Sequence, residues 1–183
     1  MEVIKTPIEG VVILEPKVFG DERGYFFESF SQREFEEKVC KTIFVQDNES
    51  KSSYGVLRGL HYQLPPYTQA KLVRVVKGKV LDVVVDLRKN SATFGKHVAV
   101  ELSEENRRQF FVPRGFAHGF VVLSEEVIFQ YKCDNYYAPG HEGGIRFDDP
   151  ALGIDWKIPV EDMILSEKDL KHKGIAESFV FEN

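Results

Sequence analysis

The stretch KLVRVVKGKVLDVVVDL, Lys71 to Leu87, contains two valine-rich runs separated by the turn-like sequence KGK. β-Branched residues are enriched in strands, and a glycine between two such runs marks a turn. The second run alternates between two faces, with Leu81, Val83, Val85 and Leu87 on one and Asp82, Val84 and Asp86 on the other. This period of two is that of a β-strand. The stretch therefore predicts two consecutive strands, the second with one wholly apolar face.

Short strand-like runs of the same kind recur along the chain, separated by turn signals such as KNSATFG and PRG. They are VVILEP, YFFESF, TIFVQDNES, VLRGLHYQ, HVAVEL, QFFVP, HGFVVL and VIFQYKC. Many short strands with few helices are typical of antiparallel sandwiches and barrels. We therefore predict an all-β fold, a jelly-roll sandwich or barrel with a few short helices. No repeat or linker divides the chain, which predicts a single domain over residues 1–183.

Two helix starts are indicated by capping boxes, in which a serine precedes an acidic residue by three positions. Ser31 and Glu34 form one such box ahead of REFEEKV, and Ser166 and Asp169 form the other near the C-terminus. The 15 phenylalanines of the chain suit a thick core between two sheets.

Composition limits the classes of partner and the compartment. The net charge of −5 argues against non-specific nucleic-acid binding, which needs a basic surface. Cys40 and Cys133 are the only cysteines and lie far apart, which predicts two reduced thiols. The N-terminus MEVIKTPIEG is too polar for a signal peptide, and no window approaches the ~20 apolar residues of a membrane span. We predict a soluble cytoplasmic protein with no nucleic-acid or membrane partner.

Two of the five histidines are candidates for chemistry. His61 in VLRGLHYQ and His118 in PRGFAHGF each lie near glycine in apolar, strand-like sequence. Alone, either would more often be a hydrogen-bonded core residue, but two in unusual segments favour a site. His97, His141 and His172 lie in polar sequence and are predicted to be surface residues.

The segment Pro113 to His118 has the spacing P-x-G-x-x-H, which resembles the second signature of metal-binding cupins. Their first signature supplies H-x-H and then a glutamate. The matching place here reads His61-Tyr62-Gln63, with no carboxylate from Leu64 to Gln69. Because a catalytic metal usually has at least three protein ligands, we predict a cupin without a metal, whose histidines are free for proton chemistry.

Lys71, Tyr131 and Asp169 each have a functional and a plain interpretation. Lys71 opens a strand after the one containing His61, so it either projects toward that imidazole or is a solvated strand-edge lysine. Tyr131, in FQYKCDNYY, is a core residue by its pattern. Asp169 either orients a histidine or caps the helix after Ser166, and the local pattern favours the cap.

Arg58 lies among apolar residues and needs a partner, and its guanidinium suits phosphate or carboxylate. Strict alternation places Arg58 and His61 on opposite faces of one strand. A bulge at Gly59 would re-aim one of the two side chains, as bulges beside active sites do.

Taken together in order, nine blocks resemble those of dTDP-4-dehydrorhamnose 3,5-epimerases, metal-free cupin-fold enzymes, over nearly the whole chain. The blocks are FGDERGYFFESF, FVQDNES, VLRGLHYQ, KLVRVVKG, DVVVDLRKNSATFGK, FVPRGFAHGF, FQYKCDNYY, GIDW and ILSEKD. The resemblance implies inversion of two carbons, C3 and C5, that flank the 4-keto group of dTDP-4-dehydro-6-deoxy-D-glucose, giving dTDP-4-dehydro-L-rhamnose. It implies that His61 is the base, Asp169 its orienting carboxylate, Lys71 the oxyanion partner and Tyr131 the proton donor on the other face.

The resemblance also implies a substrate-binding set and a homodimer. The set is Arg23, Phe26, Glu28, Gln46, Asp47, Asn48, Arg58, His118, Glu142 and Lys168, with Asp82 as the partner of His118. The N-terminal strands are expected to be exchanged, so that Arg23, Phe26 and Glu28 act in the neighbouring subunit, and no cofactor or metal is expected.

Three alternatives remain open at this point. Related enzymes on the same scaffold epimerise one carbon or shift a ketone without inversion, although Tyr131 with His61 and Lys71 favours double epimerisation. A metal-dependent cupin oxygenase or hydrolase is disfavoured by the missing ligands. A non-catalytic sugar-nucleotide binding module would account for Arg23 and Arg58. It would not account for His61, Lys71 and Tyr131 together.

Overall fold

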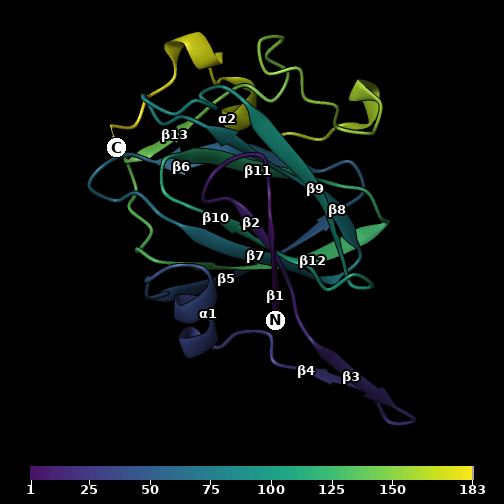
Figure 1. The fold of residues 1–183 in the computed structure, drawn as a ribbon. Coiled ribbons are helices and arrows are strands. Elements are labelled where there is room, and N and C mark those ends of the chain that lie inside the picture. The colour runs from purple at the N-terminus through teal and green to yellow at the C-terminus, as the bar shows by residue number, and fades with distance from the viewer. Residues whose placement is uncertain (183) are drawn as a thin grey trace.

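The computed structural model describes residues 1–182, which form two facing antiparallel β-sheets and a separate hairpin (Figure 1). The six-stranded sheet has the order β1 (Glu2–Lys5), β2 (Val12–Glu15), β10 (Gln109–Val112), β7 (Lys71–Lys77), β12 (Glu126–Cys133) and β5 (Gln46–Ser53). The five-stranded sheet has the order β13 (Glu142–Gly144), β6 (Leu57–Gln63), β11 (Phe116–Val122), β8 (Lys79–Asp86) and β9 (His97–Ser103). The predicted all-β cupin-like sandwich is confirmed. The sequence did not indicate β1, β13 or the first strand of the hairpin.

Strand β8 shows why the sheets face each other. Its alternation is confirmed, since Val80 and Val84 lie in the core between the sheets while Leu81, Val83, Val85 and Leu87 lie in a second cluster on the outer face. Both faces of the strand are buried. The outer cluster is completed by the C-terminal third of the chain, which contributes Ile145, Phe147, Leu152, Trp156 and Phe181.

Four of the 15 phenylalanines fill the core between the sheets, Phe110, Phe116, Phe120 and Phe129. The Phe120 ring from β11 stacks on that of Phe129 from β12, with centroids 4.2 Å apart, which joins one sheet to the other. A third cluster on the outer face of the six-stranded sheet takes Phe35 and Phe111. The phenylalanines therefore serve three clusters rather than one thick core.

The two predicted capping boxes start the two α-helices. The Ser31 side chain accepts a hydrogen bond from the Glu34 N–H at the start of α1 (Gln32–Lys38). The Ser166 side chain accepts one from the Asp169 N–H at the start of α2 (Glu167–Leu170). The remaining helical segments are two 3₁₀ turns, η1 (Val160–Asp162) and η2 (Ile175–Glu177). None of the helices among residues 1–182 has the length and apolar composition that a membrane crossing requires.

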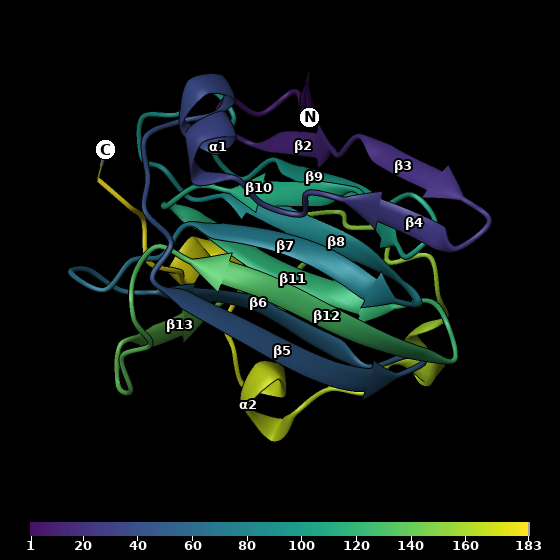
Figure 2. The same ribbon diagram turned by 90° about the horizontal axis from the view of Figure 1, so that it is seen from below.

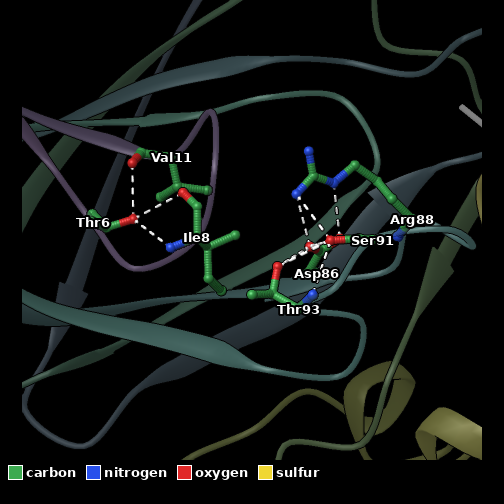
Figure 3. A network of polar contacts seen from close by, with 7 residues as sticks. All are labelled: Thr6, Ile8, Val11, Asp86, Arg88, Ser91 and Thr93. Carbon is green, nitrogen blue, oxygen red and sulfur yellow. Dashed lines mark hydrogen bonds and ion pairs between the residues drawn. The ribbon is translucent and has the colours of Figure 1, made fainter.

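A polar network holds the loop after β8 to the end of the strand (Figure 3). The buried Asp86 carboxylate accepts hydrogen bonds from the Arg88 guanidinium at 2.9 and 2.8 Å, from the Ser91 hydroxyl at 2.5 Å and from the Thr93 hydroxyl at 2.7 Å. Burial alone would raise the pKa of Asp86, but these bonds lower it to about 2. Nearby, Thr6 closes the β1–β2 loop by donating to the Val11 carbonyl at 2.8 Å.

The hairpin formed by β3 (Val18–Asp21) and β4 (Gly24–Phe27) extends away from both sheets (Figures 1 and 2). Phe19, Tyr25 and Phe26 on it are exposed, Phe26 by 69%. Such an unpartnered aromatic surface is unusual for a lone chain.

Candidate active site

A cavity of about 500 Å³ opens between the two sheets and brings all four predicted catalytic residues together. His61 on β6 and His118 on β11 come from the five-stranded sheet, while Lys71 on β7 and Tyr131 on β12 come from the six-stranded sheet. Asp169, Arg58 and Lys168 complete the polar lining. Imidazole and phenol thus reach one space from facing sheets.

The ladder between β6 and β11 is irregular at Gly59, where the sequence left a bulge open, and Arg58 and His61 line the same cavity. His118 pairs with His61 and Phe120 pairs with Arg58, so two residues of β6 oppose one residue of β11. Gly59 has a φ of +135°, and a Cβ there would lie 2.5 Å from the Gly119 Cα. Only glycine fits both the backbone conformation and the close approach of the two strands.

His61 is held by Asp169. The His61 Nε2 lies 2.5 Å from the Asp169 Oδ1, and the second carboxylate oxygen accepts the Gly59 N–H at 3.4 Å. Burial alone would raise the pKa of Asp169, but His61 and the Gly59 N–H lower it overall, so the carboxylate is ionised. Because a carboxylate accepts, we assign the proton of the neutral ring to Nε2, which leaves the Nδ1 lone pair basic.

Asp169 performs both functions that the sequence offered as alternatives. Its backbone N–H donates to the Ser166 hydroxyl at 3.1 Å and so takes part in the cap of α2. Its carboxylate is only 4% exposed and points instead to His61. The cap therefore fixes the backbone from which the orienting carboxylate projects.

His118 forms a second histidine–carboxylate pair, as expected. Its Nε2 lies 2.8 and 3.0 Å from the two oxygens of Asp82. Both side chains are almost completely buried. Burial raises the pKa of Asp82, and the nearby His118 and Lys71 offset part of that rise.

Lys71 is half-buried, and its ammonium lies in the cavity lining without a matched acceptor. Among residues 1–182 its ammonium makes no side-chain hydrogen bond or ion pair, and its Nζ lies 5.6 Å from the centre of the Tyr131 ring. Burial lowers the pKa of Lys71, and Cys133 and Asp82 oppose that effect. Burial likewise raises the pKa of Tyr131, so its phenol stays protonated near neutral pH.

The cavity rim carries two cations. Arg58 donates from Nε to the Ser52 hydroxyl at 3.1 Å, so its terminal nitrogens are left for an anion. Lys168 is exposed and pairs with Glu142 at 2.5 Å, which brings two of the predicted substrate-binding residues together. Burial alone would raise the pKa of Glu142, but the hydrogen bond from Lys168 outweighs it and lowers that pKa overall.

Seven predicted substrate-binding residues do not line this cavity: Glu142, which pairs with the lining residue Lys168, and six others. On β5, Gln46 accepts the Tyr137 N–H at 3.1 Å, and Asn48 donates to the Cys133 sulfur at 3.8 Å. Asp47 points to the opposite face of the strand, where it pairs with Lys132 at 3.0 Å. The other three, Arg23, Phe26 and Glu28, lie on or beside the β3–β4 hairpin.

The prediction that His172 is a surface residue is wrong. Its side chain is only 14% exposed, and its Nε2 lies 3.6 Å from the Asp169 Oδ1. Its ring centre is 5.7 Å from that of His61. Burial is the main cause that lowers the pKa of His172. His97 and His141 are half-buried, and the His141 ring packs against that of Tyr67.

Sequence reasoning also missed the segment that closes one side of the cavity. Ile164 and Leu165 line it together with Ser166. The segment is held by parallel bridging to Val56, because the Leu57 N–H donates to the Ile164 carbonyl at 2.9 Å. The motif ILSEKD contains this segment, but the sequence predicted roles only for its Ser166, Lys168 and Asp169.

The donor set at the usual cupin metal position does not fit a metal ion. His61 and His118 are register partners, but each faces a different carboxylate, Asp169 and Asp82 respectively. Within residues 1–182, the one group of three potential ligands is His61, Asp169 and His172, and it excludes His118.

The sequence can now be compared with known proteins. The family model of dTDP-4-dehydrorhamnose 3,5-epimerase matches residues 5–177. The chain belongs to the dTDP-4-dehydrorhamnose 3,5-epimerase family. The resemblance inferred from the nine sequence blocks is therefore confirmed.

Relatives and solved structures of this epimerase family match along the whole chain. The dTDP-4-dehydrorhamnose 3,5-epimerase of Shigella flexneri is 57% identical over 99% of this chain and 99% of its own. The crystal structure of the Elizabethkingia anophelis epimerase has a TM-score of 0.94 at 57% identity, covering 98% of this chain and 99% of that one. The crystal structure of the Legionella pneumophila dTDP-6-deoxy-D-glucose-3,5-epimerase was solved with dTDP-4-keto-L-rhamnose. It has a TM-score of 0.93 at 51% identity and covers 96% of this chain and 93% of that one.

Proposed function

We propose that this chain is an epimerase that inverts C3 and C5 of dTDP-4-dehydro-6-deoxy-D-glucose to give dTDP-4-dehydro-L-rhamnose. One observation carries the proposal: His61 from one sheet and Lys71 and Tyr131 from the facing sheet line a single cavity. Inversion needs a base on one face of the sugar ring and an acid on the other. The two sheets supply these groups from opposite sides.

His61 is the base. Its Nδ1 takes the proton from the carbon beside the ketone, and the electron pair of the C–H bond moves onto the carbonyl oxygen. An imidazole suits this step because its ordinary pKa of about 6.5 lies near neutral pH. The ionised Asp169 stabilises the imidazolium that forms, through the 2.5 Å contact to Nε2.

Lys71 stabilises the enolate oxygen. An ammonium with no matched acceptor gains an ionic partner only when negative charge develops on the substrate. Such preorganised donors contribute about 2.7–4 kcal/mol to transition-state stabilisation in comparable sites. No cofactor is needed, because both the proton transfers and the charge stabilisation come from side chains.

Tyr131 returns a proton to the carbon from the other face. Its raised pKa keeps the phenol protonated, as an acid requires. After each inversion His61 releases its proton to solvent and Tyr131 regains one. The same three groups serve C3 and C5 in turn, because both carbons flank the one ketone.

The nucleotide end lies toward the cavity rim. Arg58 offers a planar guanidinium to the diphosphate, and Lys168 adds a second cation. His118 contacts the substrate or supports the site from behind. We extend the proposal to a cytoplasmic enzyme acting as one domain, in keeping with its two free cysteines and its net charge of −5.

A homodimer with exchanged N-terminal strands completes the binding set. Arg23 is 85% exposed and Phe26 69% exposed on a hairpin that reaches away from its own sheets. We propose that these residues and Glu28 bind substrate in the partner subunit, together with Gln46, Asp47 and Asn48 at the subunit boundary. Mixing inactive His61→Ala and Arg23→Ala proteins should restore activity, whereas no recovery after subunit exchange would contradict sharing of the site.

The epimerase reading is tested by exchange in heavy water. Incubation with dTDP-4-dehydro-6-deoxy-D-glucose should place deuterium at both carbons beside the ketone, as followed by NMR. Exchange at one carbon only would indicate a mono-epimerase. No exchange at either carbon would reject the proposal.

The role of Tyr131 is tested by comparing exchange with inversion in Tyr131→Phe. Loss of the donor should slow inversion more than exchange, because His61 can still remove and return a proton on its own face. Tyr136→Phe, a change at an exposed tyrosine, is the matched control. Equal losses of both rates in Tyr131→Phe would deny it the donor role.

A further inference from the structure

Asp169 faces a second imidazole, which the proposed epimerase chemistry does not use. The His172 Nε2 lies 3.6 Å from the same Oδ1 that bonds to His61. That nitrogen is buried and has no hydrogen-bond partner within residues 1–182. Buried polar atoms are rarely left unpaired without a reason.

The space around the His172 nitrogen is created by glycine. A Cβ at Gly144 on β13 would lie 2.4 Å from the His172 Nε2, so any other residue there would displace the ring. The His172 ring therefore fits beside Asp169 without closing the gap between them. The result is a ring nitrogen that faces the carboxylate from beyond hydrogen-bond range.

We propose that His61, Asp169 and His172 form an inhibitory binding site for a divalent transition-metal ion of the zinc class. Their ligand atoms all lie within 4.8 Å of one another. Two imidazoles and one carboxylate are a common donor set for zinc and are poorly suited to magnesium.

The distances require one local movement. Zinc bonds of about 2.0–2.2 Å in a tetrahedral site place neighbouring ligand atoms roughly 3.3–3.6 Å apart. The Asp169–His172 separation of 3.6 Å already meets this, whereas the 2.5 Å hydrogen bond between His61 and Asp169 must lengthen. The Gly59 N–H on the second carboxylate oxygen supplies an outer contact that orients the ligand. His61 is 38% exposed, so an ion can enter from the cavity.

Occupancy would inhibit through the tautomer of His61. A metal on Nε2 needs the lone pair of that nitrogen, so the ring proton moves to Nδ1. The Nδ1 lone pair that removes the substrate proton is then lost. The ion does not need to block the sugar itself. Lys168 lies close enough to oppose cation binding, which limits the affinity.

The binding site is tested with cobalt, whose visible spectrum reports its ligands. Titrating Co²⁺ into the chelator-treated full chain should give ligand-field bands that Zn²⁺ removes and Mg²⁺ does not. His172→Gln should weaken binding by at least about tenfold, because losing even an outer-shell contact costs about 10–100-fold. His97→Gln, which changes a histidine outside the site, is the matched control. Gly144→Ala provides a second variant, since it displaces the His172 ring but keeps the imidazole.

The inhibitory role rests on the proposed epimerase function and is measured separately. Zn²⁺, but not Mg²⁺, should slow deuterium exchange in the native chain. In His172→Gln, the same Zn²⁺ concentration should slow exchange by a smaller factor, measured against that variant's own metal-free rate. Equal Co²⁺ affinity in native and His172→Gln protein would overturn the site. Cobalt binding with unchanged exchange would overturn the inhibition, whereas absence of exchange in metal-free protein would reject the epimerase function alone.

Discussion

The two histidine–carboxylate pairs use the same chemistry in different surroundings. In the His61–Asp169 pair the ring is 38% exposed to the cavity and the carboxylate 4%. In the His118–Asp82 pair the values are 8% and 0%. The carboxylate of the first pair comes from a helix 108 residues along the chain, whereas that of the second comes from the neighbouring strand β8. An imidazole can move protons to a substrate only if one of its nitrogens reaches that substrate.

The bulge at Gly59 creates part of this difference. It interrupts the β6–β11 ladder between the Arg58–Phe120 pair and the His61–His118 pair, so that Arg58 and His61 both line the cavity. His118, in the regular part of β11, instead faces the β8 carboxylate. We infer that the first pair performs the proton transfer and the second supports the charges around it.

The strongest test of this division compares His61→Ala with His118→Ala. His61→Ala should lower the rate of deuterium exchange by about 10²–10⁴-fold, the usual contribution of a general base. His118→Ala should mainly lower the free energy of unfolding, by about 1–3 kcal/mol, because Asp82 is left buried without its partner. Exchange rates per folded molecule and denaturant unfolding measure the two effects. A similar loss of exchange in both variants would remove the distinction.

A second test compares the two carboxylates on the inner face of β8. Burial raises the pKa of Asp82, whereas for Asp86 its hydrogen bonds outweigh burial and lower the pKa from 3.8 to about 2. A lowered pKa means that the folded state favours the ionised carboxylate, so Asp86 stabilises the fold above pH 3.8 by about 2 kcal/mol. Asp86→Asn should lose about that amount at neutral pH with little change in exchange rate per folded molecule.

The loss of stability in Asp86→Asn should depend on pH in one direction. The difference in unfolding free energy between native protein and Asp86→Asn should shrink as pH falls from 3.8 toward about 2, where the native carboxyl also becomes protonated. Urea unfolding at several pH values measures it. Asp155→Asn removes an exposed pair with Lys157 and should change stability little. A difference that does not depend on pH would show that Asp86 acts through shape rather than charge.

The sequence predicted the local features of the fold because they depend on neighbours in the chain. The alternation of β8 and the serine caps of both helices are read within a few residues. The sequence did not predict β13, because Glu142-Gly143-Gly144 contains no residue that favours a strand. This segment pairs only because the edge of β6 is available to it.

The site features that the sequence did not predict depend on contacts between residues far apart in the chain. His172 looked like a surface residue because its neighbours Lys171 and Lys173 are charged, and only the fold places it beside Asp169. The local pattern at Asp169 predicted a cap, which is present, but could not show that the carboxylate points elsewhere. That second role came from the family resemblance. The bulge at Gly59 was suggested by a conflict within the sequence itself, since alternation separated Arg58 from His61.

The smallest expected effect concerns how the buried pair acts on Lys71. Burial lowers the pKa of Lys71, and the negative charge of Asp82 opposes that change. Asp82→Asn keeps an oxygen that can accept a hydrogen bond from His118 but removes the charge. The pKa of Lys71 should therefore fall further.

In the proposed mechanism the ammonium form of Lys71 stabilises the enolate, so we expect loss of its proton to set the alkaline limit of activity. In Asp82→Asn the alkaline fall of the exchange rate should move to lower pH. Asp86→Asn changes a carboxylate on the same face that makes its contacts with the 88–93 loop, and it should leave the alkaline limit unchanged. An alkaline limit that does not move in Asp82→Asn would mean that Lys71 keeps its proton without help from the buried pair, and the two pairs would then act independently.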